Sequence, residues 1–439
     1  MRVTFATLIC CLLLEAQEGP RRLSLRSAVE MALAPAGNAR VQLAREAVKQ
    51  AQARSAQSRA ALLPDLSSTL AQQNLTRNLA ALGVRLDLAV PGFRFPEHVG
   101  PFNVFDARAS VTQNILDAGS IRRFQASRLN VGQARSESEN AGDQVASQVA
   151  RAYLAAQRAE ALVETSKASV VLAEALEKLA ERQKEFGAGL AIEVTRARVE
   201  LANARQQLIA IANERHRARL QLLKLIGMKL DSEIVLTDTL SHAPVEALTL
   251  KQALDAAHGS RADIKAQRLR AAAAELQSSA VKLERLPSLA GFADYGSIGA
   301  GINRASPTRT YGIALRVPVY DGGRRDARRA ESLSQLRQER IRAADLEEQA
   351  ALEVRLALDA LDSSDNEVKV SQEGVRLAEE ELAQARRRYE GGVANSLEVT
   401  GAQTRLERAR GNRVNALFAY NLARIDLGSA MGAVSRYLP

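Results

Sequence analysis

The chain has 439 residues, no tryptophan and only 4% aromatic residues. Large globular cores rely on aromatic volume, so this composition instead favours long helices that approach closely along alanine-lined seams. The net charge of +10 raises the question of nucleic acid, but the basic residues are dispersed among glutamates and no stacking aromatic residues interleave with them. A solvated helical surface explains the charge, and no nucleic-acid partner is predicted.

The first residues predict a secretory signal peptide over 1–17. Arg2 precedes an apolar core, and cleavage near Ala16 or Gln17 would release the mature chain. The core is too short to span a bilayer, and no later segment is apolar enough for a transmembrane helix. Both cysteines, Cys10 and Cys11, lie in this segment, so a mature chain without it has no disulfide. A lipoprotein site at Cys10 is the alternative, but bulky residues precede it.

A short helix followed by a longer one is predicted twice. Ser24 caps a short helix that ends before Pro35, and Asn38 caps a longer helix that ends before Pro64. In the second half, residues 248–250 open a short helix, and 261–286 form a longer one that ends before Pro287. The same order of short helix, longer helix and proline therefore recurs in both halves of the chain.

Beyond each of these prolines the apolar period changes from helical to two, which indicates strands. Four strands are expected, at about 66–75, 104–116, 289–298 and 310–320, with a long loop over 76–103 and a shorter one over 299–309. In the last strand Tyr311, Ile313, Leu315, Val317 and Val319 share one face. Strands of about ten residues have the length that crosses a bilayer when tilted.

Two long antiparallel helical hairpins are predicted after the strand pairs, over 119–228 and 322–433, each with a first arm of about 65 residues and about 100 Å. The second arm of the later hairpin carries a heptad seam: Val399, Ala402, Leu406, Ala409, Ala416, Tyr420, Ala423, Leu427 and Ala430. Subtracting 205 from these numbers gives a matching seam from Val194 to Leu225. We therefore divide the mature chain into a first repeat (18–228), a linker (229–247), a second repeat (248–433) and a tail (434–439).

Four strands with one apolar face form a sheet with two open edges, and unpaired backbone groups in lipid cost several kcal/mol each. The strands must therefore close by recruiting further copies, which predicts a channel. A soluble periplasmic coiled-coil scaffold or interaction protein is the alternative; it explains the heptads but not the matched strands. His98, His216, His242 and His258 share no metal-ligand spacing, and no nucleophile–base arrangement stands out. No catalytic residue, metal site or cofactor is predicted, so an enzyme is disfavoured.

Two segments resemble the TolC-like outer-membrane efflux protein family, and the resemblance covers essentially the whole mature chain. They are Pro318-Val319-Tyr320-Asp321-Gly322-Gly323 and Tyr389-Glu390-Gly391-Gly392-Val393-Ala394-Asn395-Ser396-Leu397-Glu398-Val399, with fainter echoes over 114–119 and 189–194. The resemblance implies a mainly α fold with a membrane β-barrel. In that fold a tandem repeat of helix–strand–strand–long helical hairpin builds a homotrimeric α-barrel/β-barrel channel with twelve strands.

The resemblance also implies a function. The chain is expected in the bacterial outer membrane, in contact with outer-membrane lipid and extending into the periplasm. There it would form the passive conduit of a tripartite efflux or type I secretion system. Its partners would be a periplasmic adaptor protein and an inner-membrane pump or translocator, and its gate would lie at the periplasmic hairpin tips.

Two acidic residues and six turn residues are the candidate site. In the family, inward acidic residues narrow the periplasmic end just after the second turn; Glu398 occupies the first of these positions and Glu193 aligns with it in the first repeat. In the family, a second acidic residue and a nearby basic residue complete a charge network in the closed state. Here Gly401 and Ala394 occupy those two positions, so this charge network is not expected. The expected adaptor contacts are the turn residues Gly187, Gly189, Leu190, Gly391, Gly392 and Val393.

Overall fold

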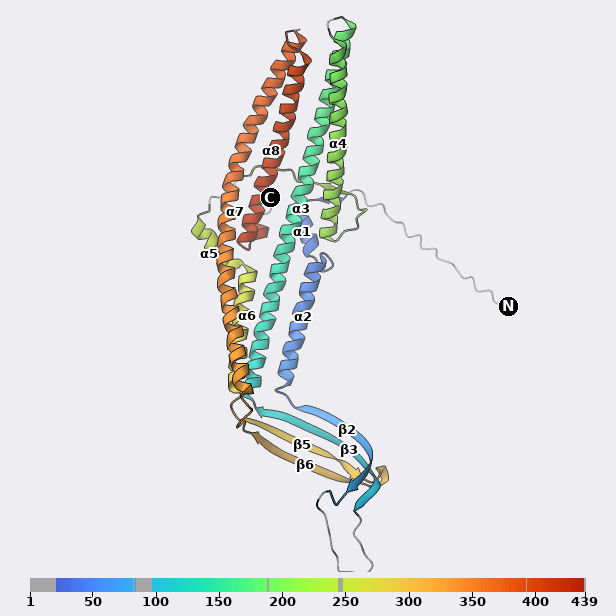
Figure 1. Cartoon of the computed structure of the whole chain (residues 1–439), viewed down its shortest axis with the longest axis vertical. Helices are drawn as coiled ribbons and strands as arrows, with labels where there is room; N and C mark the ends of the chain where they lie inside the picture. Colours follow the sequence, from blue (N-terminus) through green and yellow to red (C-terminus); the bar gives the residue numbers. More distant parts are fainter. Residues whose placement is uncertain are drawn as a thin grey trace, which may run out of the picture. The chain divides into compact units, whose positions relative to one another are not determined.

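The computed structural model describes residues 21–81, 83, 97–187, 189–243, 248–391 and 393–437. The predicted signal peptide, with Cys10 and Cys11, and the turn residue Gly392 lie outside these residues. The elements are β1 (Arg21–Leu23), α1 (Leu25–Leu33), α2 (Ala39–Ala60), β2 (Asp65–Asn78), β3 (His98–Leu116), α3 (Ala118–Glu185), α4 (Ala191–Ile226), β4 (Ile234–Leu236), α5 (Leu250–Ser260), α6 (Ala262–Leu283), β5 (Ser288–Gly299), β6 (Ala305–Arg316), α7 (Arg324–Glu390) and α8 (Ser396–Ala430). Two single-turn 3₁₀ helices, Ile302–Arg304 and Val434–Arg436, complete them. The chain is mainly helical, as predicted (Figure 1).

The chain divides into two compact units. The sheet unit comprises Arg45–Ser138 and Asp263–Leu346, and the hairpin unit comprises Met1–Ala44, Glu139–Ala262 and Glu347–Pro439. Helices α3 and α7 each contribute residues to both units. Among the described residues, none of the helices combines the length and the hydrophobicity that a bilayer crossing requires.

The sheet unit contains one antiparallel sheet with the strand order β2-β3-β5-β6. Its central strands pair closely: Gly296 lies opposite Arg108, and a β-carbon on Gly296 would meet the Ala107 carbonyl oxygen at 2.3 Å. Strands β2 and β6 are the two edges of the sheet. The sheet of one chain is therefore open rather than closed into a barrel.

The strand ends differ from the prediction in both directions. After a register shift, β2 and β3 continue to pair at Arg77–Val99 and Asn78–His98, so the first loop is shorter than the predicted 76–103. The last strand ends at Arg316, opposite Ser288, rather than near residue 320. Strand β5 offers no residue beyond this pair, and Pro318 has no N–H for a sheet ladder.

The two faces of the sheet differ in polarity, as the alternation predicts. On one face Arg108 donates to Asp106 at 2.8 Å and to Asp294 on the neighbouring strand at 3.3 Å. On the other face Tyr311 and Ile313 are 79% and 71% exposed. Large apolar side chains that point away from the chain's own core mark a surface for lipid or for another subunit.

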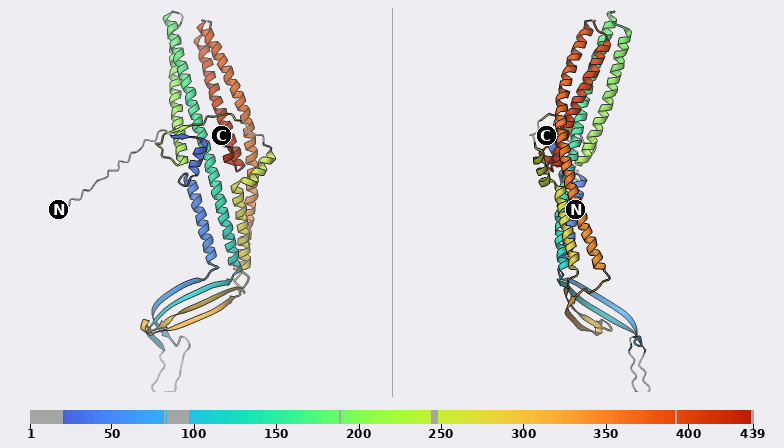
Figure 2. Two further views of the ribbon diagram at one scale, coloured as in Figure 1. Left: turned by 180° about the vertical axis from the view of Figure 1, so that it is seen from behind. Right: turned by 60° about the vertical axis from the view of Figure 1, so that its left-hand side comes forward.

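The hairpin unit contains the turns and second arms of both hairpins, whose first arms are α3 with 68 residues and α7 with 67. The predicted heptad seam of α8 is buried, with Ala409 only partly buried. Leucines of α3 pack against the α7–α8 cluster, so the two hairpins lie side by side within this unit (Figure 2). Alanine seams permit this close lengthwise packing.

Capping residues fix where the helices begin and end. Ser24 accepts from the Ser27 N–H at the start of α1, and Asn38 accepts from the Arg40 N–H at the start of α2, as predicted. At the end of α4, Gly227 adopts φ 77°, which favours glycine. A core around the fully buried Tyr153 links α1, α3, α4 and the parallel pair β1–β4.

Candidate gate at the hairpin tips

The first hairpin turns through two glycines. Gly187 has φ 74° and its N–H donates to the Lys184 carbonyl oxygen at 3.0 Å, while the Gly189 N–H donates to the Gln183 carbonyl oxygen at 2.9 Å. A β-carbon on Gly189 would crowd residue Gln183 at 3.0 Å. Both predicted residues therefore serve the turn itself, because each closes the backbone where a side chain would strain it.

Glu193 completes the start of α4. Leu190, the residue before the helix, has no polar side chain, and its N–H donates instead to Glu193 Oε2 at 3.3 Å. The carboxylate thus satisfies a backbone donor and lies in the favourable field of the helix N-terminus. Glu193 therefore caps the start of α4. Its alignment with Glu398 did not indicate this structural role.

Glu398 is held differently. The Asn395 side chain caps α8 by accepting from the Glu398 N–H at 3.2 Å, which leaves the Glu398 carboxylate free of capping. Its Oε1 lies 3.0 Å from Nε of Arg388, in the last turn of α7. The structure therefore pairs Glu398 with a cation of its own hairpin. Sequence reasoning missed this partner, although Arg388 belongs to the basic run 386–388 that precedes the turn.

The tips expose apolar side chains. Among the predicted contact residues, Leu190 is 67% and Val393 is 75% exposed, and Phe186, beside the first turn, is 83% exposed. Ile192 and Leu397, near the starts of α4 and α8, are also exposed. Exposed apolar residues at a turn, where polar residues are usual, indicate a contact surface for another protein.

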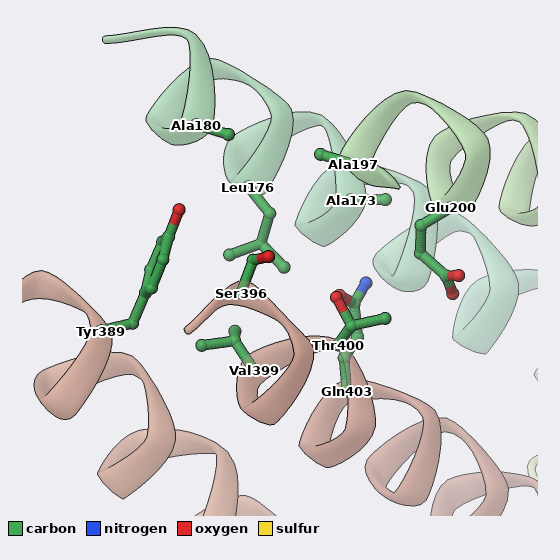
Figure 3. A pocket seen from close by; sticks show the side chains of 10 residues that line it. All are labelled: Ala173, Leu176, Ala180, Ala197, Glu200, Tyr389, Ser396, Val399, Thr400 and Gln403. Atoms are coloured by element: carbon green, nitrogen blue, oxygen red, sulfur yellow. The ribbon is translucent and has the colours of Figure 1, made fainter. Parts of the chain in front are cut away.

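A small pocket with two buried polar side chains lies between the two hairpins beside these turns (Figure 3). Tyr389 from α7 and Gln403 from α8 are 5% and 4% exposed, yet the Tyr389 hydroxyl and Gln403 Oε1 have no hydrogen-bond partner among the described residues. Burial, and then the negative charge of Glu193, raise the pKa of Tyr389. The pocket brings together residues of both repeats, and sequence reasoning did not select any of them as site residues.

Apolar residues surround this pocket. Leu172, Leu176 and Leu179 of α3 pack against the α7–α8 cluster that contains Tyr389 and Val399. At Gly401, where the family has a second acid, a β-carbon would lie 3.3 Å from the Arg405 guanidinium, which pairs with Glu381. The described residues contain no group of three histidine, cysteine or acidic side chains that could hold a metal ion. The residues around the pocket thus form a packing contact between the helices of the two hairpins.

An open antiparallel sheet with an exposed apolar face, combined with two long helical hairpins, defines the class of outer-membrane export channels. The family model described as outer membrane efflux protein matches residues 31–228 and 253–433, and the chain belongs to that family. This match confirms the TolC-like resemblance and favours an outer-membrane channel over a soluble scaffold.

Individual relatives agree with this assignment. The chain is 26% identical over 400 residues to the pyoverdine export outer membrane protein OpmQ of Pseudomonas aeruginosa, which covers 88% of this chain and 80% of OpmQ. Its fold is similar to that of the outer membrane protein VceC of Vibrio cholerae, with a TM-score of 0.77 and 21% identity over 93% of this chain and 96% of VceC. The Campylobacter jejuni CmeC outer membrane channel gives a TM-score of 0.80 with 17% identity, over 93% and 86% of the two chains.

The protein is therefore an efflux protein of the outer membrane that extends into the periplasm. Its family consists of transport conduits rather than enzymes.

Proposed function

We propose that three copies of the chain form one channel, in which the four strands of each copy contribute to a twelve-stranded barrel. The open sheet carries this proposal: β2 and β6 each leave one edge unpaired, and unpaired edges are costly in lipid. Pairing β6 of one copy with β2 of the next satisfies both edges. Closed rings built from a repeated head-to-tail contact are a standard solution for such surfaces.

The chain is further proposed to consist of two repeats, 18–228 and 248–433, joined by the linker 229–247 and followed by the tail 434–439, after removal of a signal peptide over 1–17. The two separate matches to the family model, 31–228 and 253–433, support this division. Each repeat then supplies two strands and one hairpin to the wall of the conduit.

The hairpin tips are proposed to dock onto a periplasmic adaptor protein, which links the channel to an inner-membrane pump or translocator. The exposed apolar side chains of Leu190 and Val393 support this contact, with Gly187, Gly189 and Gly391 in the turns that present them. Gly392, which lies outside the described residues, is included in the proposed contact because of its place in the sequence. Substrate choice is assigned to the pump, because a wide aqueous conduit contacts its cargo less closely than a binding pocket does.

Gating is proposed to occur where the two hairpins meet, with Glu398 and Glu193 at the entrance. The buried polar groups of Tyr389 and Gln403 weaken this contact, because an unsatisfied buried polar group costs about 1–3 kcal/mol. We therefore propose that the hairpins separate at this contact when the channel opens. Replacing Gln403→Leu should stabilise the closed contact and lower the open probability of the channel.

A matched control exists for this substitution. Gln157 of α3 is also buried, and its Nε2 has no partner within the part of the chain that the structure describes, but Gln157 does not line the tip pocket. Gln157→Leu should leave the open probability close to that of the wild type. Equal effects of both substitutions on single-channel recordings would contradict a gate at the tips.

The conduit itself is tested with the full chain in planar bilayers and by cysteine cross-linking of the strand edges. The only cysteines lie in the predicted signal peptide, so single cysteines placed over 67–69 and 308–310 of the edge strands report contacts between copies. Channels and a cross-linked trimer are the expected results. A chain that stays monomeric and opens no pores would refute the proposal.

A further inference from the structure

Two glutamates lie close together where the two hairpins meet. Glu200 of α4 lines the pocket shown in Figure 3, and Glu407 of α8 lies one helical turn beyond Gln403, which lines the same pocket. Burial, and then the negative charge of Glu200, raise the pKa of Glu407. One acid from each hairpin therefore repels the other across the contact between α4 and α8.

These two acids lack a cation of their own. Among the described residues, neither Glu200 nor Glu407 forms an ion pair. Arg410, in the next turn of α8, lies instead 2.9 Å from Glu379 of α7. Both acids are half-buried, and charges that are withdrawn from water are usually paired in proteins. The contact thus lacks the positive charge that would stabilise it.

A buried oxygen atom adjoins the two acids. The Gln403 side chain is 4% exposed, and its Oε1 has no hydrogen-bond partner within the described part of the chain. Figure 3 shows the Gln403 amide and the Glu200 carboxylate directed into the space between α8 and α4. This space measures about 20 Å³, which is enough for one water molecule or one ion. Because carboxylate and amide oxygens all accept positive charge, one cation would satisfy the three groups together.

We propose that Glu200, Gln403 and Glu407 bind one Ca²⁺ ion, which bridges the two hairpins. Ca²⁺ takes about six to eight oxygen ligands in flexible geometry, from carboxylates, amide carbonyls and water. Each carboxylate can offer both of its oxygens and the amide one, and water completes the coordination. Since only two of the ligands are charged, we expect a dissociation constant of about 0.1–1 mM, as in weak extracellular Ca²⁺ sites.

Bound Ca²⁺ opposes the separation of the hairpins. Without the ion, Gln403 Oε1 is an unsatisfied polar group and the two acids repel each other, and both effects weaken the contact. With the ion, the same three groups hold α4 to α8. This effect on opening rests on the proposed function, whereas Ca²⁺ binding requires only the hairpin unit, to which all three residues belong.

The test is isothermal titration calorimetry with CaCl₂ on the full chain in dodecyl maltoside, after a chelator has removed bound metal. The parent protein carries Glu398→Gln, so that the acid proposed at the entrance does not contribute. Glu407→Gln should weaken Ca²⁺ binding about tenfold or more, because one ligand loses its charge. Gln403→Glu should strengthen it about tenfold, because a third carboxylate replaces the amide. The control Glu214→Gln removes an exposed acid of α4, about 21 Å along the helix from Glu200, and should bind like the parent.

The melting temperature of the same samples gives a second measurement, because an ion that binds only the folded chain stabilises it. The assignment is wrong if CaCl₂ produces neither heat nor a rise in the melting temperature of the parent. Equal weakening by Glu407→Gln and Glu214→Gln would indicate diffuse attraction to acidic helices instead. A melting temperature that rises on acidification but not with CaCl₂ would show that the acids bind only protons. Trimer mass and planar-bilayer conductance report separately on the proposed function.

Discussion

Replacing Arg388→Gln should strengthen block of the channel by Mg²⁺ added on the side of the hairpin tips. Three Glu398 carboxylates around an entrance would attract divalent cations. In the structure each carboxylate already has a cation, because Arg388 Nε lies 3.0 Å from Glu398 Oε1. Removing the arginine leaves the acid free for Mg²⁺.

The size of the effect follows from the exposure of the pair. At 3.0 Å in water the Coulomb energy is about 1.4 kcal/mol, but the side chains are 59% and 40% exposed, and ordering them costs entropy. Exposed ion pairs contribute about 0.2–1 kcal/mol, which corresponds to about a 1.5- to 5-fold change in the Mg²⁺ concentration for half block. Salt should reduce the difference.

Planar-bilayer recordings with added Mg²⁺ measure this concentration. Arg387→Gln is the matched control, since it removes the same charge from an exposed neighbour in the last turn of α7. Glu398→Gln should weaken block, and the double variant with Arg388→Gln should behave like Glu398→Gln alone. Equal effects of Arg387→Gln and Arg388→Gln, or unchanged block in Glu398→Gln, would show that Mg²⁺ does not compete with Arg388 for Glu398.

Three further predictions concern the hairpin unit. Tyr153→Phe should lower the free energy of unfolding by about 0.5–1.5 kcal/mol in urea titrations, and Tyr153→Ala by about 3–5 kcal/mol, because the hydroxyl donates to the Leu23 carbonyl oxygen at 2.8 Å and the ring is fully buried. Burial, and then the charge of Glu200, raise the pKa of Glu407, so its ionisation destabilises the fold as pH rises; Glu407→Gln should raise the melting temperature at pH 7.5 and lose that advantage near pH 4. Gly227→Ala should cost about 1–2 kcal/mol, measured by the same urea titrations against Gly259→Ala, whose added β-carbon meets open space.

Local patterns were sufficient to predict the helices. The seam of α8 and the caps at Ser24 and Asn38 depend on residues close in sequence, and the structure contains them where the pattern placed them. Strand ends depend on a distant partner instead. Val317 and Val319 continue the apolar face beyond Arg316, but β5 has no residue left to pair with them, and only the sheet register reveals this.

The candidate site was predictable only in part, for a similar reason. The turns follow from glycine spacing, but the pocket joins Tyr389 and Gln403 to residues of α3 and α4, about 200 positions earlier in the chain. A polar residue next to a buried seam, as Gln403 is beside Ala402, is the one signal that could have indicated a second packed face.

The two aligned glutamates show how one neighbouring residue changes the role of a side chain. Leu190 cannot cap α4, so Glu193 turns back to the backbone of its own helix. Asn395 caps α8 with its own side chain, which leaves the Glu398 carboxylate able to reach Arg388. Sequence alignment treats the two acids as equivalent, whereas the residue three positions before each one determines which acid remains available to ions. We therefore assign the Mg²⁺ block predicted above to Glu398 rather than to Glu193.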